Sequence, residues 1–538
     1  MPASRAARAA GRAESRAAGT SLYIMPLRQQ SALPPGLSDV IKMQARSTFS
    51  AQSVHTRFAA AFLAATLTSI LTAPIANARA PATPAETEAL EIYRTIVSYP
   101  TFEGSGKVPE MARYLAGKFR GAGFAEKDIH IIPVGETASL VVRYRGAGSA
   151  GSGAGSSDNA GNKPVLLMAH MDVVPARRED WERDPFKLVE ENGFFYGRGA
   201  ADDKAAVAAL TATFLRLKAE KFVPRRDLVI FFSGDEETNA TSVSEVIAKH
   251  RDLVDAEYAF NADAGGGVLS EGDAKPTVFL VQGAEKTYAT FELTLRSPGG
   301  HSSRPTPDNV IYDLADVLKR VQAIQWPVMS NEWTLSNLGA VAKTTPGPVG
   351  EALKAFVASP HDGAAANVLA AEPAYVGLTR TTCVATMLQA GHAENALPQS
   401  ATATVNCRIF PGTLVETVRE TLQHAAGDNV SLETLDKPSA SDASPMRKDV
   451  MDSIRRVIHR RYPGLPVVPY MSAGATDGKY FRAAGIPVYG FVFLFGKENE
   501  DFSHGLNEKI RAEEFYRGLE DWHALLTDVA GKRRKASR

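Results

Sequence analysis

The chain has 538 residues, a formal net charge of +0 and 44% hydrophobic residues. This length exceeds what a single compact core supports and predicts two domains. The balanced charge gives no reason to expect nucleic acid or an anionic membrane as a partner.

The first part of the chain, residues 1–80, is expected to lie outside the folded domains. Its Ala- and Arg-rich beginning has no periodicity, and an apolar stretch over 58–71 is followed by small residues at Ala76 and Ala78. This order is typical of a cleaved signal peptide, and the stretch is too short to favour a membrane span. A buried N-terminal helix is the alternative. We expect an exported protein that starts at Met43 and keeps no stable membrane anchor.

Short, unbroken apolar runs that alternate with helical segments predict a buried sheet. Strands are expected over residues 165–170, 227–232, 258–262 and 486–495, and helices over 86–99, 108–125 and 204–220. Unbroken apolar runs fit strands that are covered on both faces. Their alternation with helices indicates an α/β fold with a doubly wound, mostly parallel sheet.

A second, α+β domain is predicted as an insertion within the α/β domain. Residues 288–296 alternate like an antiparallel strand and 308–322 are helical, whereas 325–380 have no clear period. The main sheet resumes after the insert. The predicted division is an N-terminal arm with a signal peptide over 1–80, a catalytic domain in two parts over 81–285 and 437–538, and a lid domain over 286–436.

Polar side chains follow the ends of the predicted parallel strands. They are His170, Asp172, Asp202, Glu236, Glu237, Asp263 and His504. The carboxyl ends of parallel strands form the ligand-binding edge of an α/β sheet. So many carboxylates would repel one another there unless cations neutralise them. Imidazole and carboxylate groups together are suitable ligands for divalent zinc, and two zinc ions bridged by one carboxylate would account for these side chains as ligands.

We expect Asp202 to bridge the two ions. The expected terminal ligands are His170, Glu237, Asp263 and His504. Asp172 is expected to accept the proton of the second ring nitrogen of His170 and so to orient that ring. Glu236 is predicted to act as the general base. A solvated loop is the alternative for the Glu236–Glu237 pair, and a core histidine at a strand end is the alternative for His170.

Four stretches carry a resemblance to a known family. They begin at His170, Gly197, Gly234 and His504, and they resemble the signatures of the co-catalytic zinc hydrolases, which include aminoacylase, carboxypeptidase S, acetylornithine deacetylase and glutamate carboxypeptidase. The resemblance implies two zinc ions per chain, with cobalt or manganese able to substitute. It also implies an often cis peptide bond after Asp202 and a lid that commonly mediates a homodimer.

Further stretches of the insert look most like carboxypeptidase S and the secreted N-acyl amino acid hydrolases. Residues 297–305 resemble the family's lid histidine loop, so the resemblance implies that His301 stabilises the oxyanion. It likewise implies that Asn395 and Arg408 hold the substrate's carboxylate or its scissile carbonyl, a role that suits the planar guanidinium. A glycine-rich turn is the alternative for His301, and a structural ion pair for Arg408.

The sequence therefore predicts an exported dinuclear zinc hydrolase that cleaves an amide bond next to a carboxylate. Its substrate would be a small peptide, in a carboxypeptidase reaction, or an N-acyl amino acid. An aminopeptidase or dipeptidase on the same scaffold is the closest alternative, and it would need an acidic group to hold a free amine. A binding module that kept the fold without the chemistry is the alternative from another class.

The chain's two cysteines, Cys383 and Cys407, lie at equal distance in sequence from Asn395. If their segments form an antiparallel pair, the two thiols can face each other within bridging distance. Export would permit a disulfide. Two free buried thiols are the alternative.

Overall fold

The computed structural model describes residues 80–147, 163–500 and 502–531. The expected signal peptide lies outside these residues. Within the described ranges, every helix is too short or too polar to cross a membrane.

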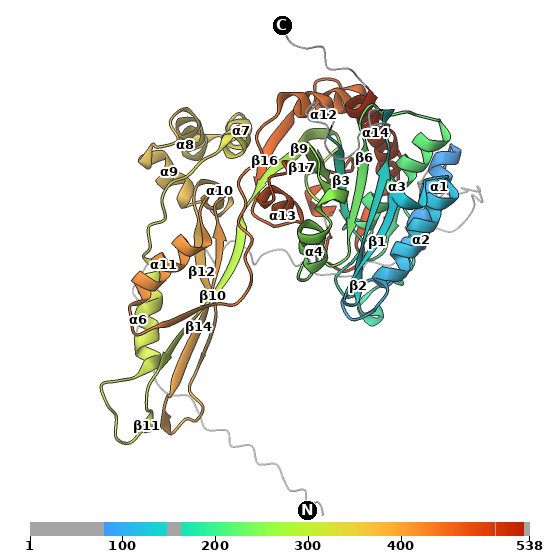
Figure 1. Cartoon of the computed structure of the whole chain (residues 1–538). Coiled ribbons are helices and arrows are strands. Elements are labelled where there is room, and N and C mark those ends of the chain that lie inside the picture. The colour runs from blue at the N-terminus through green and yellow to red at the C-terminus, as the bar shows by residue number, and fades with distance from the viewer. Residues whose placement is uncertain (1–79, 148–162, 501, 532–538) are drawn as a thin grey trace, which may run out of the picture. The chain divides into compact units, whose positions relative to one another are not determined.

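A ten-stranded mixed sheet forms the larger core (Figure 1). Its strands are β1 (Ile129–Val134), β2 (Thr137–Tyr144), β3 (Val165–His170), β6 (Leu228–Ser233), β7 (Tyr258–Asn261), β8 (Gly266–Leu269), β9 (Pro276–Glu285), β16 (Val467–Ser472), β17 (Val488–Gly490) and β18 (Phe495–Gly496). Their order is β1-β2-β6-β3-β7-β17-β9-β8-β18, with β16 paired to β9. The central strands β6, β3, β7 and β17 are parallel, whereas β1, β2 and β9 have antiparallel neighbours. This confirms the predicted α/β class.

Helices cover both faces of this sheet. One face carries α1 (Pro84–Val97), α2 (Val108–Gly121), α3 (Lys204–Ala219), α12 (Lys448–Arg461) and α14 (Ala512–Gly531), and the other α4 (Thr241–Lys249), α5 (Arg251–Val254) and α13 (Gly478–Ala483). Successive residues of β3 enter opposite cores: Leu167 packs beneath the first group of helices and Leu166 beneath the second. Side chains alternate along a strand, so burial on both sides requires the unbroken apolar run seen in the sequence.

The insert contains a four-stranded antiparallel sheet of order β12-β14-β10-β15. Its elements are β10 (Thr287–Arg296), β12 (Thr382–Ala390), β14 (Ser400–Ile409), β15 (Ser431–Thr434), α6 (Val310–Gln322) and α11 (Val415–Ala426). The two helices pack on one face of the sheet around Phe291 and Val405. Two short pairings complete the described strands: β11 (Gly300–His301) with β13 (Ala396–Leu397), and β4 (Val189–Glu191) with β5 (Phe194–Tyr196) and β19 (Lys509–Arg511).

One expectation about secondary structure is wrong, and one segment had no predicted elements. Residues 486–495 form the two short strands β17 and β18, because the chain between them leaves the ladder while its phenylalanines stay buried. Residues 325–380, which show no period, form α7 (Glu332–Val341), α8 (Gly347–Ala358), α9 (Gly363–Ala370) and α10 (Pro373–Thr379) around their own small core. Two of these helices, α8 and α9, contain several alanines, and α10 is only two turns long, so no distinct apolar stripe marks the segment in the sequence.

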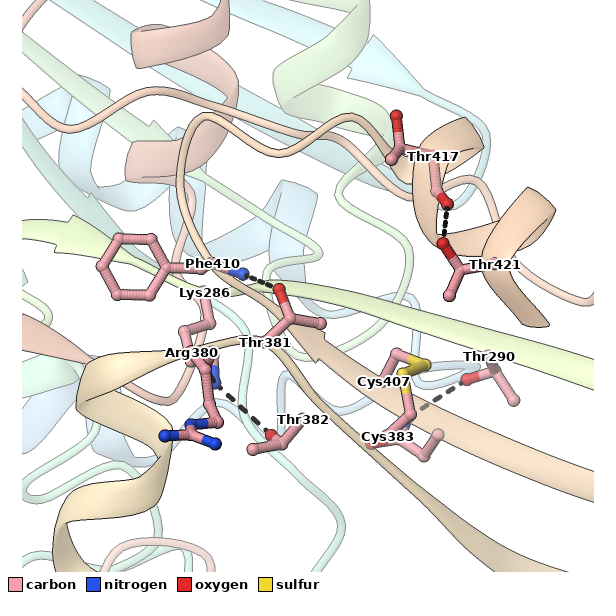
Figure 2. Close-up of a disulfide and its surroundings, with 11 residues drawn as sticks. Lys286, Thr290, Arg380, Thr381, Thr382, Cys383, Cys407, Phe410, Thr417 and Thr421 are labelled. Carbon is pink, nitrogen blue, oxygen red and sulfur yellow. Dashed lines mark hydrogen bonds between the residues drawn. A yellow bond between two sulfur atoms is a disulfide. The ribbon is translucent and has the colours of Figure 1, made fainter. Parts of the chain in front are cut away.

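A disulfide joins Cys383 of β12 to Cys407 of β14 (Figure 2). The two residues are direct partners in the antiparallel register, with Cα atoms 4.1 Å apart. The register expected from the sequence is therefore confirmed, and the bridge forms between strands that already pair.

Thiol titration tests the disulfide. Titration of the denatured, unreduced protein should find no reactive thiol, and titration after reduction should find two. Replacing both Cys383 and Cys407 by Ala should lower the free energy of unfolding by about 2–4 kcal/mol, because the bridge closes a loop of moderate length. Two reactive thiols in the unreduced protein would contradict the pairing.

Candidate metal centre

Three neighbouring parallel strands bring the candidate residues to one edge of the sheet. His170 is the last residue of β3 and lies opposite Ser233, the last residue of β6. Glu236 and Glu237 follow β6, and Asp263 follows β7 on the other side of β3. The carboxyl ends of these strands therefore place one imidazole between two sets of carboxylates, as expected for an open α/β sheet.

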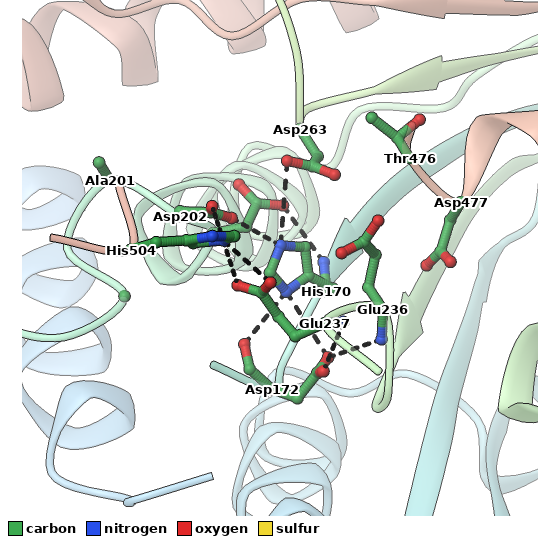
Figure 3. Close-up of polar contacts among 12 residues, drawn as sticks. His170, Asp172, Ala201, Asp202, Glu236, Glu237, Asp263, Thr476, Asp477 and His504 are labelled. Carbon is green, nitrogen blue, oxygen red and sulfur yellow. Dashed lines mark hydrogen bonds and ion pairs between the residues drawn. The ribbon is translucent and has the colours of Figure 1, made fainter. Parts of the chain in front are cut away.

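Asp202 connects two clusters of potential ligands. One cluster is His170, Asp202 and Asp263, and the other is Asp202, Glu237 and His504. The Nε2 atom of His170 lies 2.8 Å from Oδ1 of Asp202, and that of His504 lies 3.2 Å from Oδ2 (Figure 3). The two oxygens of one carboxylate thus face two different imidazoles, which is the arrangement that a bridging ligand requires.

Each cluster also has a carboxylate of its own. Oε2 of Glu237 lies 2.9 Å from Nε2 of His504, and Oδ1 of Asp263 lies 3.9 Å from Nε2 of His170. Each cluster therefore offers one imidazole, one carboxylate and one oxygen of the shared carboxylate. This donor set fits zinc and other divalent metal ions.

The electrostatics of the protein alone favour a bound cation. Burial raises the pKa of Asp263 well above its usual range, and the neighbouring acids Glu236 and Asp202 raise it further. Hydrogen bonds to Asp202 and Glu237 raise the pKa of His504 to about 10. A raised pKa means that Asp263 resists ionisation and that His504 keeps its proton. Both shifts indicate that the site has too little positive charge for its carboxylates. A divalent cation would supply it and reverse both shifts.

Asp172 holds the turn that carries the two glutamates. Its carboxylate accepts the backbone N–H groups of Glu236 at 3.1 Å and Glu237 at 3.0 Å. Nδ1 of His170 lies 3.1 Å from the backbone oxygen of Asp172 and 3.6 Å from its carboxylate. The ring of His170 thus has both the backbone oxygen and the carboxylate of Asp172 close to Nδ1. A single residue positions members of both clusters.

Glu236 belongs to neither cluster, and its side chain lies beside Asp477 (Figure 3). Burial raises the pKa of Glu236 well above its usual range, with Asp477 adding to the shift. Asp477 is buried and accepts a hydrogen bond from the hydroxyl of Ser233. Sequence reasoning assigned no role to the side chain of Asp477, which lies in a glycine-rich stretch that reads equally well as a turn.

A buried ion pair that sequence reasoning also missed joins the segments of Asp202 and His504. Glu508 is fully buried, bonds to Arg198 at 2.7 Å, and accepts the backbone N–H of Asp202 at 3.0 Å. Arg198 donates in turn to the backbone oxygens of His504 and Gly505, at 3.3 and 3.1 Å. The peptide bond between Asp202 and Asp203 is cis, as the resemblance implied.

The lid residues do not gather with the metal ligands in one cluster. His301 lies on β11 opposite Ala396 of β13, and the backbone oxygen of Asn395 accepts the N–H of Ser302. Arg408 lies near the far end of β14, which places it about 26 Å from Ser400 at about 3.3 Å per residue. The structure therefore pairs Asn395 with the His301 loop and separates both from Arg408.

Arg408 contacts the large domain. Its guanidinium lies over the ring of Tyr288 at 4.7 Å, and Nη1 donates to the backbone oxygen of Ala473 at 3.1 Å. Ala473 belongs to the segment that leads to Asp477. Among the described residues, no carboxylate forms an ion pair with Arg408, so the structural ion pair considered from the sequence is not found there.

Comparison with known proteins agrees with this geometry. The family described as peptidase family M20/M25/M40 matches residues 166–528. The chain is 31% identical over 364 residues to the N-fatty-acyl-amino acid synthase/hydrolase of Homo sapiens, covering 66% of this chain and 71% of that protein. It is 25% identical over 382 residues to a carboxypeptidase S-like protein of Dictyostelium discoideum, covering 68% and 72%.

A solved structure shows the same fold. An M20 family metallo-carboxypeptidase from Sulfolobus solfataricus aligns with a TM-score of 0.60 and 19% identity, covering 82% of this chain and 98% of that chain. The resemblance drawn from the sequence motifs is confirmed. The chain belongs to peptidase family M20/M25/M40 and is a metal-dependent hydrolase of the metallopeptidase and amidohydrolase type.

Proposed function

We propose that the protein is an exported dinuclear zinc hydrolase that cleaves an amide bond next to a carboxylate. The observation that carries the proposal is the carboxylate of Asp202, whose two oxygens face the imidazoles of two separate ligand clusters. The reaction consumes one water and releases a carboxylic acid and an amino acid. The substrate is an N-acyl amino acid or a small peptide that loses its C-terminal residue.

In this proposal the two clusters hold one metal ion each. His170 and Asp263 would hold the first ion, Glu237 and His504 would hold the second, and Asp202 would offer one oxygen to each. When bound, the ions supply positive charge that polarises the scissile carbonyl and lowers the pKa of water. Zinc is the proposed metal because histidine with carboxylate is a common zinc ligand set.

Glu236 is the proposed general base. Its backbone is fixed by Asp172 while its carboxylate stays outside both ligand clusters. Glu236 takes a proton from the attacking water and passes it to the leaving nitrogen. Burial raises the pKa of Glu236, which suits a group that must hold a proton briefly between these two steps.

Arg408 is the proposed partner of the substrate's carboxylate. Its planar fork suits a carboxylate, and its partners in the described part of the chain are a ring and a backbone oxygen. The comparisons support this substrate class, because the names of two relatives describe an N-fatty-acyl-amino acid hydrolase and a carboxypeptidase. Both names imply substrates that carry a carboxylate.

His301 is the proposed donor to the oxygen of the scissile carbonyl. The backbone N–H of Ser303 donates to Nδ1 of His301 at 3.1 Å. A neutral ring that accepts at Nδ1 carries its proton on Nε2, so Nε2 is the atom free to donate. Asn395 lies in the same loop pair and is the proposed second contact to the substrate.

The lid is the proposed dimer interface. β12 is a terminal strand of the lid sheet, and its side chains Val384, Met387 and Leu388 are 57–59% exposed. A long edge strand with exposed apolar side chains is a template for pairing with another chain.

The disulfide between Cys383 and Cys407 supports export, since such bonds persist mainly in oxidising compartments.

A substrate panel tests the proposed function. The protein should be stripped of metal with a chelator and then assayed, with zinc added back, on N-acyl amino acids, C-terminally blocked analogues and dipeptides. Substrates with a free carboxylate should be cleaved, and the blocked analogues should not. The proposal fails if metal-loaded protein cleaves only substrates that have a free amine, or none of the panel.

Substitution of the ligands should separate shared from individual roles. Asp202→Ala should lower the bound metal from two ions per chain towards none, because both clusters lose an oxygen. Asp263→Asn should remove only one ion and leave the fold intact. Elemental analysis of the purified variants measures this. Two ions bound to Asp263→Asn would exclude Asp263 as a ligand.

Substitution of the base should affect turnover alone. Glu236→Gln should retain both metal ions and lose several orders of magnitude in kcat, because the amide cannot accept the proton of water. The matched control is Glu237→Gln, one residue away, which should lose metal as well as activity. A loss of metal from Glu236→Gln equal to that from Glu237→Gln would make Glu236 a ligand.

The lid histidine should act in the transition state. His301→Ala should lower kcat by ~10²–10³ with little change in metal content or KM, the usual effect of losing one oxyanion donor. Mixing His301→Ala with Glu236→Gln tests whether the donor acts across a dimer. Recovered activity in mixed dimers means that His301 serves the partner's site, and none means that it serves its own. A wild-type kcat for His301→Ala would reject the catalytic role.

A further inference from the structure

A buried lysine joins the large domain to the lid. Lys286 is the single residue between β9 and β10, and its side chain is fully buried. Its backbone N–H donates to the backbone oxygen of Ser472 in the large domain at 3.1 Å. Its Nζ donates to the backbone oxygen of Arg380 at 2.8 Å and lies 3.4 Å from Oγ1 of Thr382, both in the lid (Figure 2). The oxygens that its ammonium group contacts are therefore neutral.

The ammonium group of Lys286 lies on the same face of the lid sheet as Arg408. Tyr288 and Thr382 are the direct antiparallel partners of Arg408 on its two sides. Directly opposed residues point to the same face of a sheet. Because Nζ of Lys286 reaches Oγ1 of Thr382, its charge belongs to this face. Lys286 precedes Tyr288 by two residues, about 7 Å along the strand. The two cations are therefore neighbours.

Neither of these two cations has an anionic partner. In the part of the chain that the structure describes, no carboxylate forms an ion pair with Lys286 or with Arg408. Glu285 is next to Lys286 in the chain, but it is buried in the large domain and pairs there with Arg482. The contacts of Arg408 are the ring of Tyr288 and a backbone oxygen. The pair thus carries two positive charges that nothing nearby neutralises.

A comparison with Lys204 shows how unusual this is. Lys204 and Lys286 are the fully buried lysines among the described residues. The negative charges of Glu508 and Asp172 act on Lys204, whereas the charge that acts on Lys286 is the positive one of Arg408. Burial and this like charge lower the pKa of Lys286 to about 7. A buried charge is costly unless an opposite charge offsets it. The missing partner is therefore an anion.

We propose that Lys286 is the second cation of the carboxylate subsite and that its charge determines which amino acids the enzyme accepts. The inference rests on the proposed function, in which Arg408 holds the carboxylate of the substrate. Lys286 acts through its charge and needs no contact with the substrate, so it is a specificity-determining residue. Two positive charges exceed the single charge of one carboxylate. The remaining charge favours an amino acid with an acidic side chain and disfavours one with a basic side chain.

The effect of this charge is expected in substrate binding. At a distance of about 7–10 Å and an effective dielectric constant of about 20, one unit charge changes a binding constant by about 15- to 50-fold. The carboxylate of the substrate carries the same charge in the ground state and in the transition state. An interaction that is equal in both states lowers KM and leaves kcat unchanged.

Removal of the charge tests the inference. Lys286→Met should raise KM about tenfold or more for an N-acyl leucine with little change in kcat, because methionine keeps the apolar part of the side chain without the charge. The acyl group should be the one that the wild type cleaves fastest. Lys286→Arg, which keeps the charge, should restore most of the affinity. The matched control is Lys343→Met, at an exposed position of the lid, which should leave KM unchanged.

A purely structural role of Lys286 would give a different result. The hydrogen bond to Arg380 fastens the end of α10, so its loss should lower the stability of Lys286→Met whatever the role of the charge. A folded, metal-loaded Lys286→Met protein with the KM of the wild type would overturn the inference.

The charge of the substrate's side chain gives a second readout. N-acyl glutamate, leucine and lysine with one acyl group should be cleaved by the wild type with kcat/KM falling in that order. The ratio for glutamate over lysine should fall about tenfold or more in Lys286→Met, since the two side chains differ in charge and respond oppositely to Lys286. Lys343→Met should keep the ratio of the wild type. Equal ratios in Lys286→Met and Lys343→Met would overturn the inference.

The proton of Lys286 should be linked to substrate binding. The charged group that faces Lys286 is Arg408. The side chain of Arg380 is directed to the backbone oxygen of Ala366, and Glu285 is held by its own ion pair. A bound carboxylate favours the charged amine and raises the pKa of Lys286 above about 7. Lys286 of the free protein is mostly neutral at pH 8, so binding should take up a proton there, and KM should rise as the pH rises through 7.

Calorimetry measures this uptake and separates the inference from the proposed function. N-acyl leucine should be titrated at pH 8 into metal-loaded Glu236→Gln, in buffers that differ in ionisation enthalpy, with and without Lys286→Met. No proton uptake, or uptake that persists with Lys286→Met, would overturn the inference, and the first result does not require that variant to fold. Such a result beside normal cleavage by the wild type leaves the proposed function standing. If the wild type cleaves no substrate that has a free carboxylate, the proposed function fails, and binding of equal strength with and without Lys286→Met would then overturn the role of Lys286 as well.

Discussion

The position of Asp202 is the constraint on which the rest of the site depends. Its carboxylate faces two imidazoles that come from segments far apart in the chain. Glu508 accepts its backbone N–H and pairs with Arg198, which in turn holds the backbone oxygen of His504. Removing one partner of such a buried pair typically costs about 3–5 kcal/mol. The ion pair therefore joins the segments that carry Asp202 and His504, and so fixes how far apart the two clusters lie.

A rigid scaffold is needed because the buried carboxylates of the site repel one another. Burial raises the pKa of Asp203, Asp263 and Glu236 well above the usual range, and nearby acids contribute to each shift. A loose arrangement would let these carboxylates move apart or into water. The strands that carry them are packed on both faces, so their ends cannot separate without opening a core. The folded sheet thus holds together a group of acids that metal ions can neutralise.

The sequence was sufficient where local pattern and chemistry agree. The apolar run before His170 predicted β3 within its exact bounds, and polar residues after neighbouring strands predicted which side chains meet. The cross-strand position of Cys383 and Cys407 followed from counting residues. In each case a short stretch of sequence contains both the element and the residue that it positions, so no knowledge of distant contacts is required.

Contacts between segments that are far apart in the chain could not be predicted from the sequence. Arg198 and Glu508 are 310 residues apart, and nothing near either one indicates a fully buried partner. Asp477 resembles a turn residue until the fold places it beside Glu236. The helices α7 to α10 are short and pack around a core of their own that mixes alanine with larger apolar residues, so no long apolar stripe marks them. What decides these features is tertiary packing, which leaves no periodic signal in one sequence.

The lid shows how this limit affects function. His301 and Arg408 both belong to the lid sheet or its loops, yet the length of β14 separates them. The scissile carbonyl and the carboxylate of an N-acyl amino acid are only a few bonds apart. One substrate cannot touch both residues of the same lid unless the strand breaks, and β14 pairs along its whole length with β10. A second copy, joined through the exposed edge of β12, could bring its own His301 to a site that already has Arg408. The separation of these two residues is therefore a physical reason for the proposed dimer.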